Sequence, residues 1–167
     1  MKKFILTLII LLASSLYVYA NTPGYLGFAY SKEIEDNNYI NNYSAGYELL
    51  YFHDSSDGYY GFSCFGLDYK WGDNGKGVSM HYVFSPPYIY DSNILGLAVG
   101  AGPNVLYNFD KKTYGISPQA DLSFFIVAIF KLNVTYRYNI YNKAEVNNSH
   151  EIEFRLSLLD YTFGLLF

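Results

Sequence analysis

The sequence is poor in several residue types that define other protein classes. Cys64 is the single cysteine among 167 residues, so an internal disulfide is impossible and none of the Cys-based metal-binding spacings occurs. After the first twenty residues no apolar stretch approaches the roughly 18–20 residues of a membrane-spanning helix; the longest runs from Phe124 to Phe130. Basic residues are also few, with 11 Lys and Arg against 15 Asp and Glu, which argues against nucleic acid as a partner.

The N-terminus has the features of a secretory signal peptide. Lys2 and Lys3 precede an apolar run over residues 4–13, and Val18-Tyr19-Ala20 supplies a small residue at the cleavage position. The alternative, an N-terminal membrane anchor, is disfavoured because the apolar run is too short to span hydrocarbon comfortably. We expect residues 1–20 to be cleaved and residues 21–167 to form one domain, with nine basic and 15 acidic residues and a net charge of −6.

Aromatic residues, in contrast, are abundant. The chain has 20 Tyr and 13 Phe, and aromatic residues make up 20% of it. Aromatic and β-branched side chains suit the half-buried surface of a sheet, and tyrosine also suits a membrane–water interface. Since no helical span follows the signal, a closed β-barrel is the one remaining way for the mature chain to cross a bilayer.

Alternation of apolar and small or polar residues indicates strands, because side chains point to opposite faces in turn. Turn sequences separate the strands, and Asn74-Gly75 is the clearest hairpin signal. In the last segment the alternation slips by one position at Leu158-Leu159; we favour a β-bulge there over a hidden tight turn. The sequence thus predicts eight antiparallel strands, at residues 25–31, 39–52, 59–72, 78–85, 94–109, 114–125, 129–141 and 151–167.

The charged residues of these strands lie on the face opposite the apolar one. A soluble barrel with an apolar interior would show the same alternation, so the charges alone do not distinguish it from a membrane barrel with a polar lumen. The membrane barrel is favoured because the apolar face is almost continuously large and aromatic, while the opposite face is rich in Gly, Ala and Ser. We therefore predict a lumen cluster of polar and charged side chains: Glu48, Asp68, Lys70, His81, Asp121, Arg137, Glu153 and Arg155.

This cluster has a structural and a functional interpretation. The functional one is a proton or ion path; the structural one is that buried charges pair with each other inside a barrel narrow enough to be filled by side chains. We favour the structural one. His81 with Ser79, Ser85 and Asp68 contains the residue types of a Ser-His-acid site, but nothing in the sequence brings them together. His53-Asp54-Ser55 lies in a predicted turn, and His150-Glu151 flanks a predicted loop. We expect no catalytic, cofactor-binding or metal-binding residues.

The whole mature chain resembles small Gram-negative outer-membrane barrels of the OmpA/OmpX type. The resemblance rests on the signal peptide, the eight alternating segments and the closing Tyr161-Thr162-Phe163-Gly164-Leu165-Leu166-Phe167. It implies an eight-stranded up-and-down transmembrane barrel with periplasmic termini and short outward loops near residues 33–38, 72–77, 110–113 and 142–149. It also implies that the barrel-assembly machinery reads Tyr161, Phe163, Leu165 and Phe167, although the glycine of this signal lies unusually near the end, at Gly164.

Barrels that act on lipids resemble the chain in size and signal. The lipid A deacylases carry His-x-Ser-Asn on a late strand, where this sequence has Arg137-Tyr138-Asn139-Ile140, so that activity is not carried over. A palmitoyltransferase-type barrel has no firm motif spacing and stays open.

From these observations we predict a monomeric, non-enzymatic outer-membrane barrel with a structural or envelope-interaction role and a polar lumen filled by side chains. Its partners would be membrane lipids and the assembly machinery, without a cofactor. The alternatives are a narrow channel or carrier for small or apolar ligands, a lipid-modifying enzyme, and a soluble periplasmic barrel.

Overall fold

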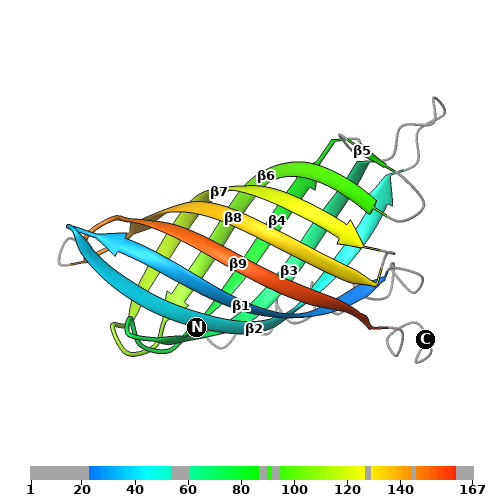
Figure 1. Cartoon of the computed structure of the whole chain (residues 1–167). Helices are drawn as coiled ribbons and strands as arrows, with labels where there is room; N and C mark the ends of the chain where they lie inside the picture. The colour runs from blue at the N-terminus through cyan, green and yellow to red at the C-terminus, as the bar shows by residue number, and fades with distance from the viewer. Residues whose placement is uncertain are drawn as a thin grey trace, which may run out of the picture.

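The chain folds into a single closed sheet (Figure 1). The computed structural model describes residues 23–53, 61–86, 90–91, 95–126, 129–143 and 146–160. Within them no helix is long and apolar enough to cross a membrane. The strands are β1 (Gly24–Glu35), β2 (Asn38–His53), β3 (Gly61–Gly72), β4 (Gly77–Ser85), β5 (Tyr90–Asp91), β6 (Leu95–Asn108), β7 (Thr113–Ile126), β8 (Phe130–Tyr141) and β9 (Ser149–Asp160).

Eight long antiparallel strands make the barrel, as the sequence predicted. Each pairs with its neighbours along the chain, β1 pairs with β9, and β4 pairs with β6 to complete the ring. The short β5 only extends the sheet beside the first residues of β6. Because every long strand has two partners, none of the described long strands is an edge strand.

The two ends of the barrel differ. At one end, here called the turn end, short reversals at residues 36–37, 73–76 and 109–112 join the strands, and β8 ends and β9 begins at the same end. Asp36 and Asn37 both have positive φ, of 47° and 65°, as a two-residue type I′ hairpin requires. Gly75 has a φ of 94°, which explains the glycine of the Asn-Gly signal. The opposite end, where β1 begins and β9 ends, is called the terminal end.

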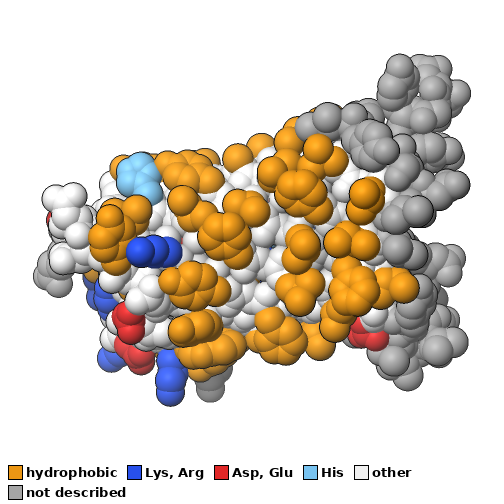
Figure 2. Space-filling model, in the orientation of Figure 1, with side chains coloured by type: hydrophobic (Ala, Val, Ile, Leu, Met, Phe, Trp, Pro, Cys, Tyr) orange, Lys and Arg blue, Asp and Glu red, His pale blue; other side chains and the backbone are white. Residues whose placement is uncertain are grey.

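The outer wall is apolar, as predicted from the alternation. Along β9, for example, the side chains alternate strictly between buried and exposed from Ser149 to Leu158. Figure 2 shows hydrophobic side chains covering the middle of the visible face, with charged side chains gathered toward the turn end at its left. The most exposed of the large hydrophobic residues are Tyr39, Ile116, Phe28, Phe154 and Tyr114.

The described part of β9 contains no bulge at Leu158-Leu159. Leu158 pairs with Leu26 and Phe130, and the next residue, Leu159, pairs with Tyr25 without a break in register. Leu159 packs against the buried apolar cluster, so its apolar side chain fits the inward face without a parity change. The unbroken ladder therefore replaces the predicted bulge up to Asp160. The predicted signal peptide and the predicted assembly signal lie outside the described residues.

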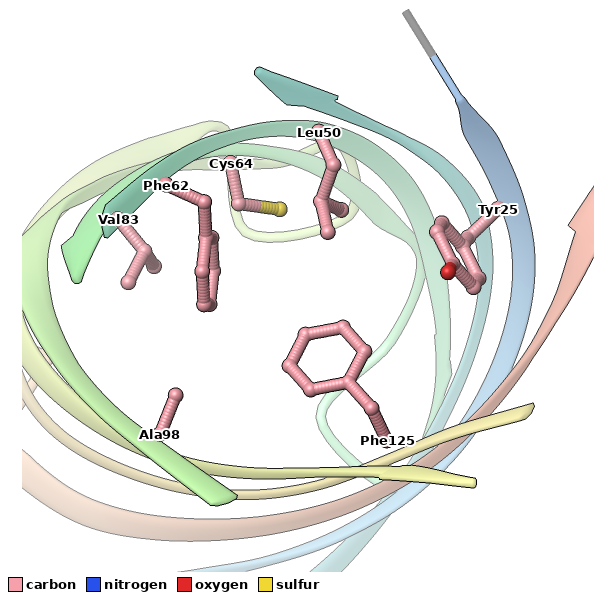
Figure 3. Packing of buried hydrophobic residues seen from close by; sticks show 7 residues of the cluster. All are labelled: Tyr25, Leu50, Phe62, Cys64, Val83, Ala98 and Phe125. Carbon is pink, nitrogen blue, oxygen red and sulfur yellow. The ribbon is translucent and has the colours of Figure 1, made fainter. Parts of the chain in front are cut away.

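The lumen is apolar at its terminal end, which differs from the polar lumen predicted from the sequence. Side chains from the strand ends point inward there, and the rings of Phe62 and Phe125 meet edge to face with centroids 5.5 Å apart (Figure 3). We call this group the apolar plug; it consists of Tyr25, Leu50, Phe62, Cys64, Val83, Ala98 and Phe125. These seven side chains are all buried, so an apolar layer lies inside the barrel at the terminal end.

Candidate functional site

All eight residues predicted to form the lumen cluster lie on the inward face. Lys70 is slightly exposed, and the other seven are buried. They come from β2, β3, β4, β7, β8 and β9, so the closed sheet brings together residues from most of its circumference. Between the turn end and the apolar plug, the polar lumen is therefore a single site built from many strands.

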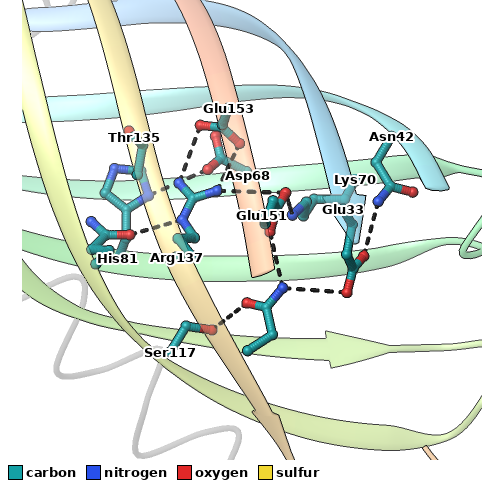
Figure 4. Close-up of polar contacts among 12 residues, drawn as sticks. Glu33, Asn42, Asp68, Lys70, His81, Ser117, Thr135, Arg137, Glu151 and Glu153 are labelled. Carbon is teal, nitrogen blue, oxygen red and sulfur yellow. Dashed lines mark hydrogen bonds and ion pairs between the residues drawn. The ribbon is translucent and has the colours of Figure 1, made fainter. Parts of the chain in front are cut away.

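The middle of this lumen is crossed by a chain of ion pairs, and Figure 4 shows the part of it between Arg137 and Glu153. The Arg137 guanidinium donates to both carboxylate oxygens of Glu153, at 2.8 and 3.1 Å. Arg155 contacts the same Glu153 at 3.2 Å and reaches Asp68 on the far side at 2.7 Å. Since β3 and β9 are separated by two strands in the sheet, this chain spans the interior rather than following the wall.

A second set of contacts fills the turn end. Lys70 contacts Glu151 at 2.6 Å. Glu33 is 2% exposed and accepts hydrogen bonds from five donors, which are Asn42, Asn74, Asn139, Tyr141 and Ser149. The sequence predicts a turn at Glu33. In the structure β1 extends to Glu35, and the Glu33 carboxylate lies inside the lumen. Glu33 lies two residues after the inward-facing Ser31, and this spacing is the feature of the sequence that indicates an inward side chain at position 33.

A third group lies next to the apolar plug. Glu48 Oε2 is 2.7 Å from the Lys131 ammonium, which also lies 3.7 Å from Cys64 Sγ. The His81 ring stands between two carboxylates, with Nε2 3.3 Å from Glu48 and Nδ1 3.3 Å from Asp68. The ligand atoms of Glu48, Cys64 and His81 lie within 4.8 Å of one another, so these three buried residues could hold a metal ion.

Neither Cys64 nor Lys131 belongs to the lumen cluster predicted from the sequence. Both lie on the inward parity of their strands, and this was the only sequence signal for either. Their proximity could not be seen in the sequence because β3 and β8 are far apart along the chain and face one another across the lumen.

Inward-facing glycines make room for the network. A Cβ placed on Gly66 would lie 2.2 Å from Cε1 and 2.3 Å from Nε2 of His81, so the imidazole occupies the space that a side chain would take. Gly46 does the same for Asp68, whose Oδ1 would be 1.9 Å from an added Cβ. These contacts explain why small residues share the inward face with large charged ones.

The polar lumen contains more negative than positive groups. Among the described residues six carboxylates face inward, against four Lys and Arg side chains and His81. Several buried polar atoms have no hydrogen-bond partner within the described chain, among them both side-chain atoms of Asn104 and the hydroxyl of Ser79. Such atoms in a polar interior are normally satisfied by water, so the polar lumen can hold water or a small ligand.

Among the residues that the structure describes, no Ser-His-acid site forms around His81. Ser85 Oγ donates to the carbonyl of Val99 at 2.7 Å instead of bonding to the imidazole. The outer wall does contain a serine–histidine contact: His53 Nε2 lies 2.7 Å from Ser63 Oγ, which is 2.8 Å from the hydroxyl of Tyr82. His53 is the last residue of β2 and belongs to the strand rather than to a turn. This contact could not be predicted from the sequence, because it depends on the pairing of β2 with β3, which brings Ser63 beside His53.

Comparison with known proteins gives structural neighbours. No protein-family model and no curated protein matches the sequence. Among solved structures, the crystal structure of the outer membrane enzyme PagL superimposes with a TM-score of 0.53 at 12% identity, covering 79% of this chain and 98% of PagL. The attachment invasion locus protein Ail of Yersinia pestis gives a TM-score of 0.48 at 13% identity, covering 83% of this chain and 95% of Ail.

The fold is that of the small outer-membrane β-barrels. The resemblance inferred from the alternating segments is thus confirmed at the level of fold. At 12% identity, the match to PagL says nothing about shared chemistry, and the fold itself serves unrelated functions.

Proposed function

We propose that the protein is an integral outer-membrane barrel with a structural or envelope-interaction role, and that its lumen conducts neither ions nor solutes. The observation that carries this proposal is the inversion of polarity between wall and interior. Phe28, Phe154 and Ile116 are each more than half exposed, whereas Glu48, Arg137 and Glu153 are 2% exposed. Exposed apolar surface of this extent is stable in contact with lipid and not in water.

Aromatic residues near the turn end support the membrane position. Tyr43 and Trp71 stack with ring centroids 6.3 Å apart, and Tyr69 stacks on Trp71 at 5.9 Å. Lys32 lies 4.1 Å from the ring centre of Tyr39 close to the same end. Aromatic rings with a neighbouring cation are typical of the level at which a membrane barrel meets the lipid headgroups.

The lumen contents support a closed interior. The ion pairs of Arg137 and Arg155 cross its middle, and the apolar plug fills its terminal end. An ion entering from the turn end would have to break buried pairs and then cross an apolar layer, and both steps carry high electrostatic costs.

Fractionation and conductance together test this proposal. We expect the protein in the outer-membrane fraction, with a gel mobility that changes on heating because the folded barrel resists detergent until it is boiled. Reconstituted in planar bilayers, it should give no discrete conductance steps. Recovery in the soluble periplasmic fraction would contradict the membrane position, and regular single-channel steps would contradict the closed lumen.

A second candidate is lipid-ester chemistry at Ser63. His53 is within hydrogen-bond distance of the Ser63 hydroxyl, as a general base must be, and the pair lies among rings that face outward, including Tyr51 4.9 Å from His53. Ser63 would attack a lipid ester carbonyl while His53 takes the hydroxyl proton. The ester C–O bond would then break, with His53 returning the proton to the departing lipid alcohol, and water would hydrolyse the acyl-serine to a free fatty acid.

The lipid profile separates the two candidates. Deletion of the gene, complemented with the native chain or with Ser63→Ala, should leave membrane lipid masses unchanged if the role is structural. A mass shift of one acyl chain that depends on Ser63 and His53 would instead establish the enzyme. Tyr82→Phe is a suitable control, since it keeps the ring and removes only the Tyr82 hydroxyl that contacts Ser63.

A further inference from the structure

We propose that the lumen binds a divalent cation of the zinc class through Glu48, Cys64 and His81, at the boundary between the polar lumen and the apolar plug. This site goes beyond the proposed structural role, and the sequence analysis expected no metal-binding residues. It depends on the interior of the barrel and not on the membrane in which the barrel lies.

The three residues supply a suitable set of ligand atoms. A thiolate, an imidazole and a carboxylate are the three ligand types by which proteins hold zinc, and their atoms here lie within 4.8 Å of one another. Glu48, Cys64 and His81 come from the adjacent strands β2, β3 and β4, so the sheet ladder fixes their relative positions. All three line the same internal cavity, which leaves space beside the ligands for a fourth, such as water.

The surroundings of His81 match those of a metal-binding histidine. Its Nδ1 lies 3.3 Å from Asp68 without a hydrogen bond to it, and its Nε2 lies 3.3 Å from Glu48. A carboxylate on the far nitrogen of a ligating histidine is the usual way in which proteins fix the tautomer and orientation of the ring. Gly66, over which the imidazole lies, provides the space that this orientation needs.

Lys131 indicates that the cluster has a place for positive charge. Its ammonium contacts both Glu48, at 2.7 Å, and Cys64, at 3.7 Å, and so stands where a cation shared by these two residues would lie. Binding of the metal would replace the thiol proton of Cys64 and displace the ammonium, and Asp121, which lines the same cavity, is an available partner for it. The inward excess of carboxylates over Lys and Arg favours uptake of a cation.

Cobalt(II) provides the direct test, because a Co²⁺–thiolate bond gives an intense near-ultraviolet absorption that carboxylate and imidazole ligands do not give. The chain, without a polyhistidine tag, is refolded into detergent with increasing Co²⁺, and with Co²⁺ plus added Zn²⁺ in a second series, so that the metal reaches the site before the barrel closes. We expect a charge-transfer band that saturates at one cobalt per chain and is lost on addition of zinc. Absence of the band from the folded protein would overturn the proposal.

Three variants make the test specific to these residues. Cys64→Ser, nearly the same size as the native residue, should remove the band, whereas Asp68→Asn should keep it and weaken binding by about 10–100-fold. Lys131→Met should bind cobalt more tightly than the native chain, since it removes the competing ammonium. A band that persists in Cys64→Ser would mean adventitious binding elsewhere and would overturn the assignment. Heat-modifiable gel mobility confirms for each variant that the barrel has folded.

Discussion

Arg137 on β8 and Glu153 on β9 form a two-pronged ion pair inside the barrel, with Nη1–Oε2 and Nη2–Oε1 distances of 2.8 and 3.1 Å. They are not direct cross-strand partners, since Arg137 pairs with Glu151 and Glu153 with Thr135. The side chains therefore meet diagonally across the ladder. The Nε–H of the same guanidinium donates to Gln119 Oε1 at 2.9 Å, so the Arg137 head group is held from two sides.

Removal of one partner from this pair should destabilise the barrel strongly. Glu153→Gln leaves Arg137 and Arg155 facing an uncharged amide, and loss of one member of a buried ion pair costs about 3–5 kcal/mol. The free energy of unfolding, measured by denaturant titration in lipid vesicles, should fall by that amount. The double variant Arg137→Met, Glu153→Met should lose less than Glu153→Gln alone, because it leaves no unpaired charge within the pair. An equal or larger loss in the double variant would contradict this account.

The strands could be predicted because a two-residue period is strong in this sequence. Ile152, Phe154 and Leu156 alternate with charged residues on β9, and no other regular structure places such a pattern on two distinct faces. The lumen cluster followed from the same parity, since ionised groups are costly against lipid. Position along the barrel axis has no comparable signal, so the sequence did not separate the polar lumen from the apolar plug.

Other features depended on distance in space rather than on period. The group of Glu48, Cys64 and Lys131 joins β2, β3 and β8, and nothing in the local sequence around Cys64 indicates that Lys131 lies nearby.

The two prolines in central strands show a case in which the alternation was the better guide. Pro103 and Pro118 are directly opposite one another on β6 and β7, although proline cannot donate to the ladder and is normally excluded from central strands. The alternation of side chains therefore predicted strands correctly at Pro103 and Pro118 in spite of the prolines.

Gly66 should tolerate a methyl group only when His81 is absent. An added Cβ would overlap the imidazole at 2.2 Å, so Gly66→Ala forces the ring out of its place between Glu48 and Asp68. Overpacking of this kind costs about 1–3 kcal/mol. In the His81→Ala background the same change should cost clearly less, and a double-mutant cycle of unfolding free energies measures the difference. Equal costs in both backgrounds would show that the methyl group does not meet the ring.

The free-energy cost of a charged side chain on the outer wall should depend on its depth in the membrane. Phe154 lies at the middle of β9, whereas Ile34 is two residues from the turn at residues 36–37. Relative to alanine at the same position, arginine at 154 should cost about 2–4 kcal/mol and arginine at 34 about 0–1 kcal/mol in lipid vesicles. Unfolding titrations of Phe154→Arg, Phe154→Ala, Ile34→Arg and Ile34→Ala give both differences. Similar values at the two depths would mean that the wall does not face hydrocarbon.

The apolar plug should control whether the barrel can conduct. Phe62 and Phe125 contribute the two rings that meet in the terminal end of the lumen, and both are inward-facing and buried. The double variant Phe62→Ala, Phe125→Ala removes both rings from this layer, and water can then enter beside Cys64. In planar bilayers we expect small conductance events that the native barrel lacks. In solution we expect Cys64 to react with a water-soluble maleimide. The matched control is Phe154→Ala, which removes an aromatic ring from the outer wall and should leave conductance and labelling at native levels. If Cys64 stays unreactive and the bilayer stays silent in the folded double variant, the ion pairs of Arg137 and Arg155 close the lumen without help from the plug.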